Sequence, residues 1–152
     1  MRIVLYEPEI PPNTGNIARL CAATGTPLHL IEPLGFKIDD KHLKRAGLDY
    51  WPNVNLCVHP HWAAFEAACP LTRVVLTSAR GGVPHHQFPF QPGDAIVLGP
   101  ETRGLPESMF DLHPLRVRIP VLPAVRSLNL STAAGILLYE ALRQTGGLAE
   151  LP

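Results

Sequence analysis

The chain has 152 residues, of which 46% are hydrophobic, and 13 lysines and arginines balance 13 aspartates and glutamates. This length and composition predict one folded domain, residues 1–152, and exclude an intrinsically disordered chain. The zero net charge excludes a polybasic nucleic-acid binder, although it leaves room for a local basic patch.

Short apolar runs alternate along the chain with longer amphipathic segments. Most of the runs are continuous, as in strands buried on both faces, and they predict strands over residues 2–6, 27–31, 54–58, 73–77, 94–98 and 116–119. The amphipathic segments predict helices over residues 14–24, 40–46, 62–68, 105–110 and 131–144. The glycine- and proline-rich stretch 81–93 is expected to be a loop. This alternation predicts an α/β fold with a largely parallel sheet flanked by helices.

Proline is unusually abundant, with 17 residues against a usual share of roughly 5%. Four prolines come just after predicted strands, where a residue without an N–H group ends strand pairing: Pro8, Pro33, Pro100 and Pro120. The carboxyl ends of parallel strands share one edge of the sheet, and ligands bind at that edge in open α/β sheets. Each proline alone would simply end its strand, but together they predict a rigid ligand cradle.

The three cysteines, Cys21, Cys57 and Cys69, are odd in number and form no Cys-x-x-Cys pair. They therefore predict buried thiols in a reducing compartment, and we expect a cytoplasmic protein. We expect no membrane segment and no secretory signal, because no apolar run approaches the roughly 18 residues that a spanning helix needs.

Several motifs of known chemistry are considered and rejected. Residues 99–104 have the glycine spacing of a phosphate loop but lack the Lys-Ser/Thr that must follow, and neither GxGxxG nor GxSxG occurs. Cys57, His59 and His61 alternate, so they would share one face of a strand. Pro60 interrupts that strand and no fourth ligand is near in sequence, so we interpret the histidines as surface residues and expect no metal site.

Three polar, glycine-containing segments remain: residues 13–19 (NTGNIAR), 98–106 (LGPETRGLP) and 119–131 (IPVLPAVRSLNLS). In the first, Asn16 and Arg19 are three apart and share a helix face. Taken together, the segments closely resemble the motifs of the SPOUT-class RNA methyltransferases. Their best match is the small bacterial subfamily that 2′-O-methylates the wobble cytidine or uridine of tRNA. The runs LYEPEIPPNTGNIARLCAATG and AGLDYW match that subfamily too.

This resemblance implies a deep trefoil knot in the last third of the chain, with S-adenosylmethionine bound in the knot. It also implies a homodimer with a shared active site that acts on the anticodon stem-loop of tRNA. By alignment with the family motifs, the expected cofactor-binding residues are Leu76, Gly99, Glu101, Ile119, Ser127, Leu128 and Asn129. Of these, Glu101 and Asn129 are expected to brace the loops or the methionine end. Without the resemblance, the aliphatic residues would be read as core and Ser131 as a helix N-cap.

Arg19 is the residue expected to carry the chemistry, with Asn16 orienting it or the ribose. Related enzymes have a matching arginine that is discussed as a general base. A guanidinium has a pKa above about 12, which favours a second role, in which Arg19 grips the phosphate beside the target ribose with a bidentate fork. The sequence leaves both roles open.

Basic side chains gather between residues 37 and 45 despite the neutral total. Phosphate contacts depend on such patches, and the predicted RNA-binding residues are Lys41, Lys44, Arg45, Arg103, Tyr139 and Arg143. Tyr50 and Trp51 are candidates to stack on a flipped base. Tyr139 suits core or dimer packing equally well, because the final helix is apolar on several sides and must be covered on several sides.

Two other functions compete with methylation of the wobble ribose. One keeps the chemistry but moves it to ribosomal RNA or another tRNA position. The other is a non-catalytic RNA-binding protein that retains the fold, which binding of S-adenosylmethionine would contradict.

Overall fold

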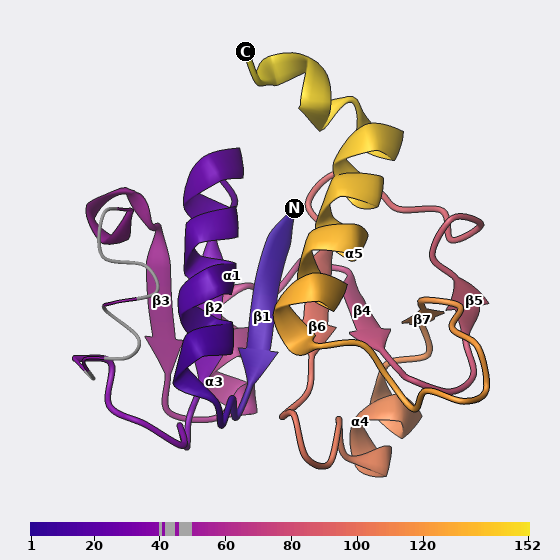
Figure 1. Ribbon diagram of the computed structural model, residues 1–152, viewed down its shortest axis with the longest axis horizontal. Helices are drawn as coiled ribbons and strands as arrows, with labels where there is room; N and C mark the ends of the chain where they lie inside the picture. The colour runs from indigo at the N-terminus through magenta and orange to yellow at the C-terminus, as the bar shows by residue number, and fades with distance from the viewer. Residues whose placement is uncertain (40, 42–44, 46–49) are drawn as a thin grey trace.

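The computed structural model of the chain describes residues 1–39, 41, 45 and 50–152. Within these residues the strands form one sheet in the order β3-β2-β1-β6-β4-β7-β5, in which every neighbouring pair is parallel (Figure 1). The strands are β1 (Arg2–Tyr6), β2 (Leu28–Ile31), β3 (Leu56–His59), β4 (Val74–Thr77), β5 (Val83–Pro84), β6 (Ala95–Leu98) and β7 (Arg116–Arg118). The predicted α/β fold with a parallel sheet is confirmed.

Each of the six predicted strands is present, with its ends within two residues of the prediction. The prediction that residues 81–93 form only a loop is wrong, because β5 lies inside that stretch. Two residues make no apolar run, so nothing in the pattern indicated this strand. Pro84 is tolerated there because β5 is at the edge of the sheet.

The helices described are α1 (Pro11–Thr24), α3 (Trp62–Ala68), α4 (Glu107–Leu112) and α5 (Leu130–Thr145), with short 3₁₀ turns η1 (Trp51–Asn53) and η2 (Gly147–Glu150). Of the helix predicted over residues 40–46, the structure describes only Lys41 and Arg45, and the other residues lie outside the described ones. Helix α1 begins three residues earlier than predicted, because Pro11 and Pro12 occupy first-turn positions that need no N–H group. Ser131 is not the N-cap of α5. The cap is Asn129, whose side chain accepts the backbone N–H groups of Ser131 and Thr132.

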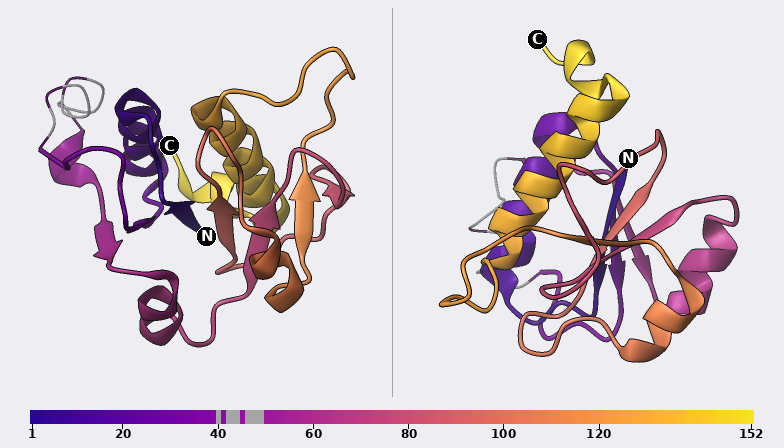
Figure 2. Two further views of the ribbon diagram at one scale, coloured as in Figure 1. Left: turned by 90° about the horizontal axis from the view of Figure 1, so that it is seen from below. Right: turned by 90° about the vertical axis from the view of Figure 1, so that its right-hand side faces the viewer.

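The helices cover both faces of the sheet, α1 and α5 on one and α3 and α4 on the other (Figure 2). Successive strand residues point to opposite faces, so Ile3 and Leu5 pack toward α1 and α5 while Val4 packs toward α3 and α4. Within the described residues, no helix is long and apolar enough to cross a membrane.

The strand ends bear out the proline pattern. Strands β1, β2, β6 and β7 each end two residues before a proline, at Tyr6, Ile31, Leu98 and Arg118 respectively. Because all the strands are parallel, these four ends lie at one edge of the sheet. The loops that follow them therefore start from a common, rigid base.

The connection over residues 119–129 carries the chain from β7 back to α5, which packs beside α1 and on β6. In the sheet order, β4 lies between β7 and β6, so this connection returns toward the middle of the fold. The trefoil knot that the resemblance implies stays a prediction.

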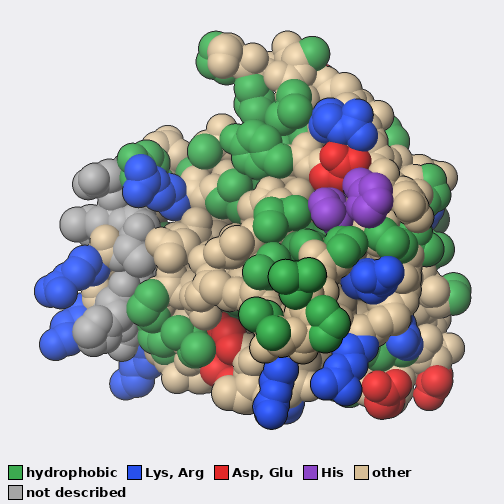
Figure 3. Space-filling view, turned by 45° about the vertical axis from the view of Figure 1, so that its right-hand side comes forward, with side chains coloured by type: hydrophobic (Ala, Val, Ile, Leu, Met, Phe, Trp, Pro, Cys, Tyr) green, Lys and Arg blue, Asp and Glu red, His purple; other side chains and the backbone are tan. Residues whose placement is uncertain are grey.

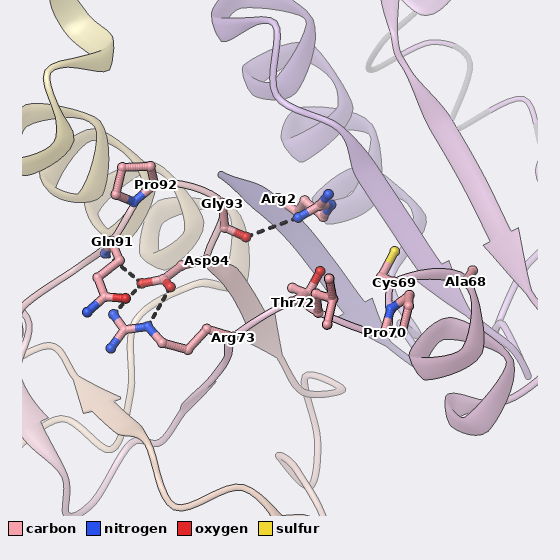
Figure 4. A pocket seen from close by; sticks show the side chains of 11 residues that line it. Arg2, Ala68, Cys69, Pro70, Thr72, Arg73, Gln91, Pro92, Gly93 and Asp94 are labelled. Carbon is pink, nitrogen blue, oxygen red and sulfur yellow. Dashed lines mark hydrogen bonds and ion pairs between the residues drawn. The ribbon is translucent and has the colours of Figure 1, made fainter.

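A hollow of about 410 Å³ lies at the opposite, amino edge of the sheet (Figure 4). Its arginines are already engaged: Arg2 donates to the carbonyl oxygen of Gly93 at 3.0 Å, and Arg73 grips the Asp94 carboxylate with two hydrogen bonds of 2.7 Å. The Asp94 side chain is fully buried and also accepts the backbone N–H of Gln91. These contacts fasten β4 and β6 together where both strands begin.

Replacing Asp94 with alanine should destabilise the fold by about 3–5 kcal/mol, because it leaves the Arg73 side chain, of which only 27% is exposed, without its carboxylate partner. Urea unfolding followed by circular dichroism measures this loss. Glu140→Ala is the matched control, since Glu140 also accepts a two-bond arginine fork, from the exposed Arg143. The control should leave the unfolding midpoint nearly unchanged, and equal shifts for both variants would contradict the prediction.

Candidate functional site

The loops that follow β6, β4 and β7 leave the sheet side by side, because these strands are neighbours in that order. They cover residues 99–106, 78–82 and 119–129. The β1–α1 loop leaves from beside β6 at the same edge. The three polar segments singled out in the sequence therefore meet at the carboxyl edge of the sheet.

The carboxylate of Glu101 is the centre of this meeting point. It accepts the backbone N–H groups of Glu9 at 2.9 Å and Ile10 at 3.2 Å, and the side-chain amide of Asn13 at 3.4 Å. The Asn129 amide in turn donates to Asn13 Oδ1 at 3.0 Å. Glu101, Asn13 and Asn129 thus connect the β6–α4 loop, the start of α1 and the N-terminus of α5, and we call these three residues the loop clasp.

Asn16 is the asparagine predicted for a catalytic role, and Asn13 was not singled out from the sequence. Asn16 is exposed on α1, whereas only 7% of Asn13 is exposed, inside the loop clasp. A signal was available, because Asn13 and the buried Ile17 are four residues apart and share the inward face of the helix. The catalytic role of Asn16 stays a prediction.

The β6–α4 loop closes tightly on itself. A Cβ atom at Gly99 would lie 2.5 Å from the Leu105 nitrogen and 2.6 Å from the Gly104 carbonyl carbon, so only glycine fits without moving the backbone. Gly104 has a φ angle of 68°, which also favours glycine, and its N–H donates to the Pro100 carbonyl. Both glycines therefore hold the shape of the loop that carries Glu101.

The other predicted cofactor residues differ in exposure. Leu76 is fully buried, and its side chain packs in the core on the α3 and α4 face. Ile119 and Leu128 are half-buried and Ser127 is exposed, all on the connection from β7 to α5. The connection thus offers two apolar side chains and one hydroxyl at the edge where the loops meet.

Arg19 is exposed on α1, and its guanidinium carbon lies 4.7 Å from the centroid of the Tyr50 ring. This is a cation–π contact, which orients the guanidinium without using its N–H donors. Trp51 packs against the core beneath α1 and α5. Of the two aromatic residues considered for base stacking, Tyr50 therefore supports Arg19 and Trp51 supports the fold.

The structure spreads the predicted RNA contacts over the surface. Lys41 and Arg45 are exposed, and Lys44 lies outside the described residues. Arg103 pairs with the Glu7 carboxylate, and Arg143 pairs with Glu140 at 2.8 Å. Hydrogen bonds from Arg143 and Gln144 lower the pKa of Glu140 to about 2, so that carboxylate stays ionised. The charges of two of the four described basic residues are therefore balanced locally.

Hydrophobic side chains gather on the face that Figure 3 shows, with basic side chains around them. Among the described residues, the exposed large hydrophobic side chains include Leu122, Val125 and Tyr139, which are 79%, 53% and 44% exposed. They lie on the connection from β7 to α5 and on α5 itself. An apolar surface of this kind is typical of an interface.

Comparisons with known proteins agree on one family. The SpoU rRNA Methylase family matches residues 1–139. A relative from Methylovorus glucosotrophus (strain SIP3-4), named tRNA (cytidine(34)-2'-O)-methyltransferase, is 57% identical over 144 residues, which are 93% of this chain and 94% of the relative.

Two solved structures share the fold. One, described as "Structural insights into the 2-OH methylation of C/U34 on tRNA", is 51% identical over 94% of each chain, with a TM-score of 0.90. The other is the SpoU methyltransferase AviRb from Streptomyces viridochromogenes in complex with the cofactor AdoMet. It is 26% identical, and the match covers 95% of this chain and 60% of AviRb with a TM-score of 0.82.

Replacing Asn13 with alanine should destabilise the protein by about 1–3 kcal/mol, because it removes the link between Glu101 and Asn129 and leaves their polar groups without that partner. Asn16→Ala is the control, and its cost should stay within about 0.5 kcal/mol because Asn16 is exposed. Urea unfolding of both variants measures the difference. An Asn16 variant as unstable as the Asn13 variant would contradict the loop clasp.

Proposed function

Because this chain belongs to the SpoU rRNA Methylase family, we propose that it transfers the methyl group of S-adenosylmethionine to the ribose 2′-hydroxyl of the wobble cytidine or uridine of tRNA. The observation that carries this proposal is the loop clasp, which joins the three motif segments at the carboxyl edge of the sheet. The tRNA substrate is supported by the 57% identity to the relative named tRNA (cytidine(34)-2'-O)-methyltransferase.

The residues present fit the cofactor. Three adjacent loops offer backbone groups, and two half-buried aliphatic side chains suit an adenine ring. We assign this role to Leu76, Gly99, Glu101, Ile119, Ser127, Leu128 and Asn129. When bound, S-adenosylmethionine supplies a methyl group already activated on a sulfonium. The chain then has to align the ribose 2′-hydroxyl with that methyl group. In ideal cases such alignment lowers the activation free energy by up to about 7–11 kcal/mol.

Within this alignment, Glu101 and Asn129 act as braces, since both are committed to the loop clasp. Arg19 holds the phosphate beside the target ribose, because its ring contact with Tyr50 leaves the N–H fork available. Lys41, Lys44, Arg45, Arg103, Tyr139 and Arg143 extend the RNA contact toward the anticodon stem-loop.

Labelled methyl transfer to tRNA tests the proposal. The probe is a tRNA transcript with cytidine or uridine at position 34, compared with the same transcript carrying 2′-deoxyribose there, and the product is mapped by nuclease digestion. We expect label only at the unmodified wobble ribose. Label at another position or in ribosomal RNA would favour the second enzyme function, and failure to bind S-adenosylmethionine would favour a non-catalytic RNA-binding protein.

Replacing Arg19 with alanine should lower the methylation rate by about 100-fold or more, because the target hydroxyl loses its alignment. Affinity for S-adenosylmethionine, measured by calorimetry, should stay nearly unchanged. Arg19→Lys keeps the charge without the fork, so it should retain more activity than alanine if the role is phosphate positioning. Retained activity in the alanine variant would contradict both the positioning and the general-base role.

We also propose a homodimer in the cytoplasm, built from one domain per chain. The exposed Leu122, Val125 and Tyr139 give a second copy an apolar surface to cover. All three cysteines are free, which fits a reducing compartment.

Sedimentation velocity at micromolar concentration should show a dimer. Val125→Asp should shift the protein toward monomer, because it places a charge in the covered surface. Leu71→Asp is the control, since Leu71 is 98% exposed near the amino edge of the sheet and should not affect assembly. A wild-type protein that sediments only as a monomer would contradict this prediction.

A further inference from the structure

Strands β2 and β3 bring two histidines and a cysteine together on the α3 face of the sheet, away from the loop clasp. His29 pairs with Cys57 in the parallel register, and His59 follows Cys57 by two residues on β3. Side chains two residues apart on a strand point to the same face. As a result, the ligand atoms of all three residues lie within 4.8 Å of one another.

The two imidazoles are held in place by their surroundings. His29 Nδ1 and His59 Nε2 are 2.9 Å apart, and the residues are only 6% and 7% exposed. Phe65 of α3 packs edge-on against both rings, with centroid distances of 5.3 and 5.5 Å. Cys57 is exposed, so the cluster is walled on one side by aromatic packing and is reached from solvent through the thiol.

We propose that His29, Cys57 and His59 form a binding site for a thiophilic divalent cation such as Zn²⁺. Imidazole nitrogen and thiolate sulfur are ligands that zinc prefers, at about 2.0–2.1 and 2.3 Å. Tetrahedral coordination at those lengths separates the ligand atoms by about 3.3–3.6 Å. The widest separation in the cluster therefore has to contract by about 1 Å, the two histidine nitrogens have to move apart by about 0.4 Å, and the fourth position is left for water.

Binding has a defined proton balance. The Cys57 thiol loses its proton to solvent when its sulfur binds the cation. The imidazole that donates in the His29–His59 hydrogen bond moves its proton to its other ring nitrogen, so each histidine stays neutral and presents a lone pair. One proton is therefore released for each cation bound.

The three residues of this cluster meet only in the folded sheet, so their spacing along the sequence does not predict a metal site. The pattern offered Cys57, His59 and His61, but His61 is occupied elsewhere, because its Nδ1 accepts the Ala64 N–H at the start of α3. His29 takes its place through strand pairing, from 30 residues away along the chain. The site is separate from the proposed methyl-transfer site, and its expected effect is to fasten the edge strand β3 to β2.

Calorimetric titration of the metal-free protein with Zn²⁺ alone tests the site. We expect one cation per chain, with one proton released as measured in buffers of different ionisation enthalpy, and a thermal midpoint that rises with zinc concentration. Titration with Co²⁺ should give the near-ultraviolet charge-transfer absorption of a cobalt–thiolate bond.

The Cys57→Ser variant should bind Zn²⁺ at least about tenfold more weakly and lose the Co²⁺ charge-transfer band. Cys57→His should recover affinity without that band. Cys69→Ser is the matched control and should bind like the wild type, because Cys69 lies outside the cluster. Methyl transfer should be the same in all of these variants.

Two results would overturn the proposal. One is the absence of zinc binding at tens of micromolar free cation. The other is equal binding by the wild type and Cys57→Ser, which would place the cation elsewhere. The folded state of each variant is checked by circular dichroism, and because Cys57 is exposed its substitution leaves the core intact.

Discussion

The candidate functional site depends on the carboxylate of Glu101, which accepts hydrogen bonds from residues about ninety positions earlier in the chain. Two of its partners are backbone N–H groups just before α1, where a helix that starts with two prolines has no side-chain cap. The third is Asn13, and through it Asn129, which also caps α5. The loop clasp, in which Asn13 is buried, therefore fixes the starts of both helices on this face of the sheet and the loop between β6 and α4.

Such a clasp works only because the sheet beneath it is parallel. Parallel pairing puts the ends of β1, β6, β4 and β7 at one edge, and the proline two residues beyond three of them stops pairing at a fixed place. At the other edge, Arg73 and the buried Asp94 lock the beginnings of β4 and β6. The loops can thus be shaped for ligands because the strands that carry them are fixed at both ends.

The positions of the long strands and of the helix ends could be predicted from the sequence, because they depend on neighbouring residues. Contacts between segments far apart in the chain could not be predicted from it. Continuous apolar runs located six strands, and Gly25 and Gly146 adopt the left-handed conformation expected after α1 and α5. Strand β5 has too few residues to make a pattern. The choice of Ser131 as cap was wrong because it depended on where α5 starts, and the contacts of Asn13 with Glu101 and Asn129 come from loops far away in the sequence. His29 joins Cys57 and His59 only through the register of β2 with β3.

Arg103, in the β6–α4 loop, and Arg143, on α5, show by contrast why Arg19 suits the proposed role. Arg103 and Arg143 are each paired with a carboxylate, which balances their charge. Arg19 instead rests on the face of Tyr50, and within the described residues it forms no ion pair. A ring face holds a guanidinium in position but satisfies none of its N–H groups, so its fork remains ready for a phosphate. Proton abstraction would instead require a guanidinium that had lost its charge, and free guanidinium groups keep theirs at every physiological pH.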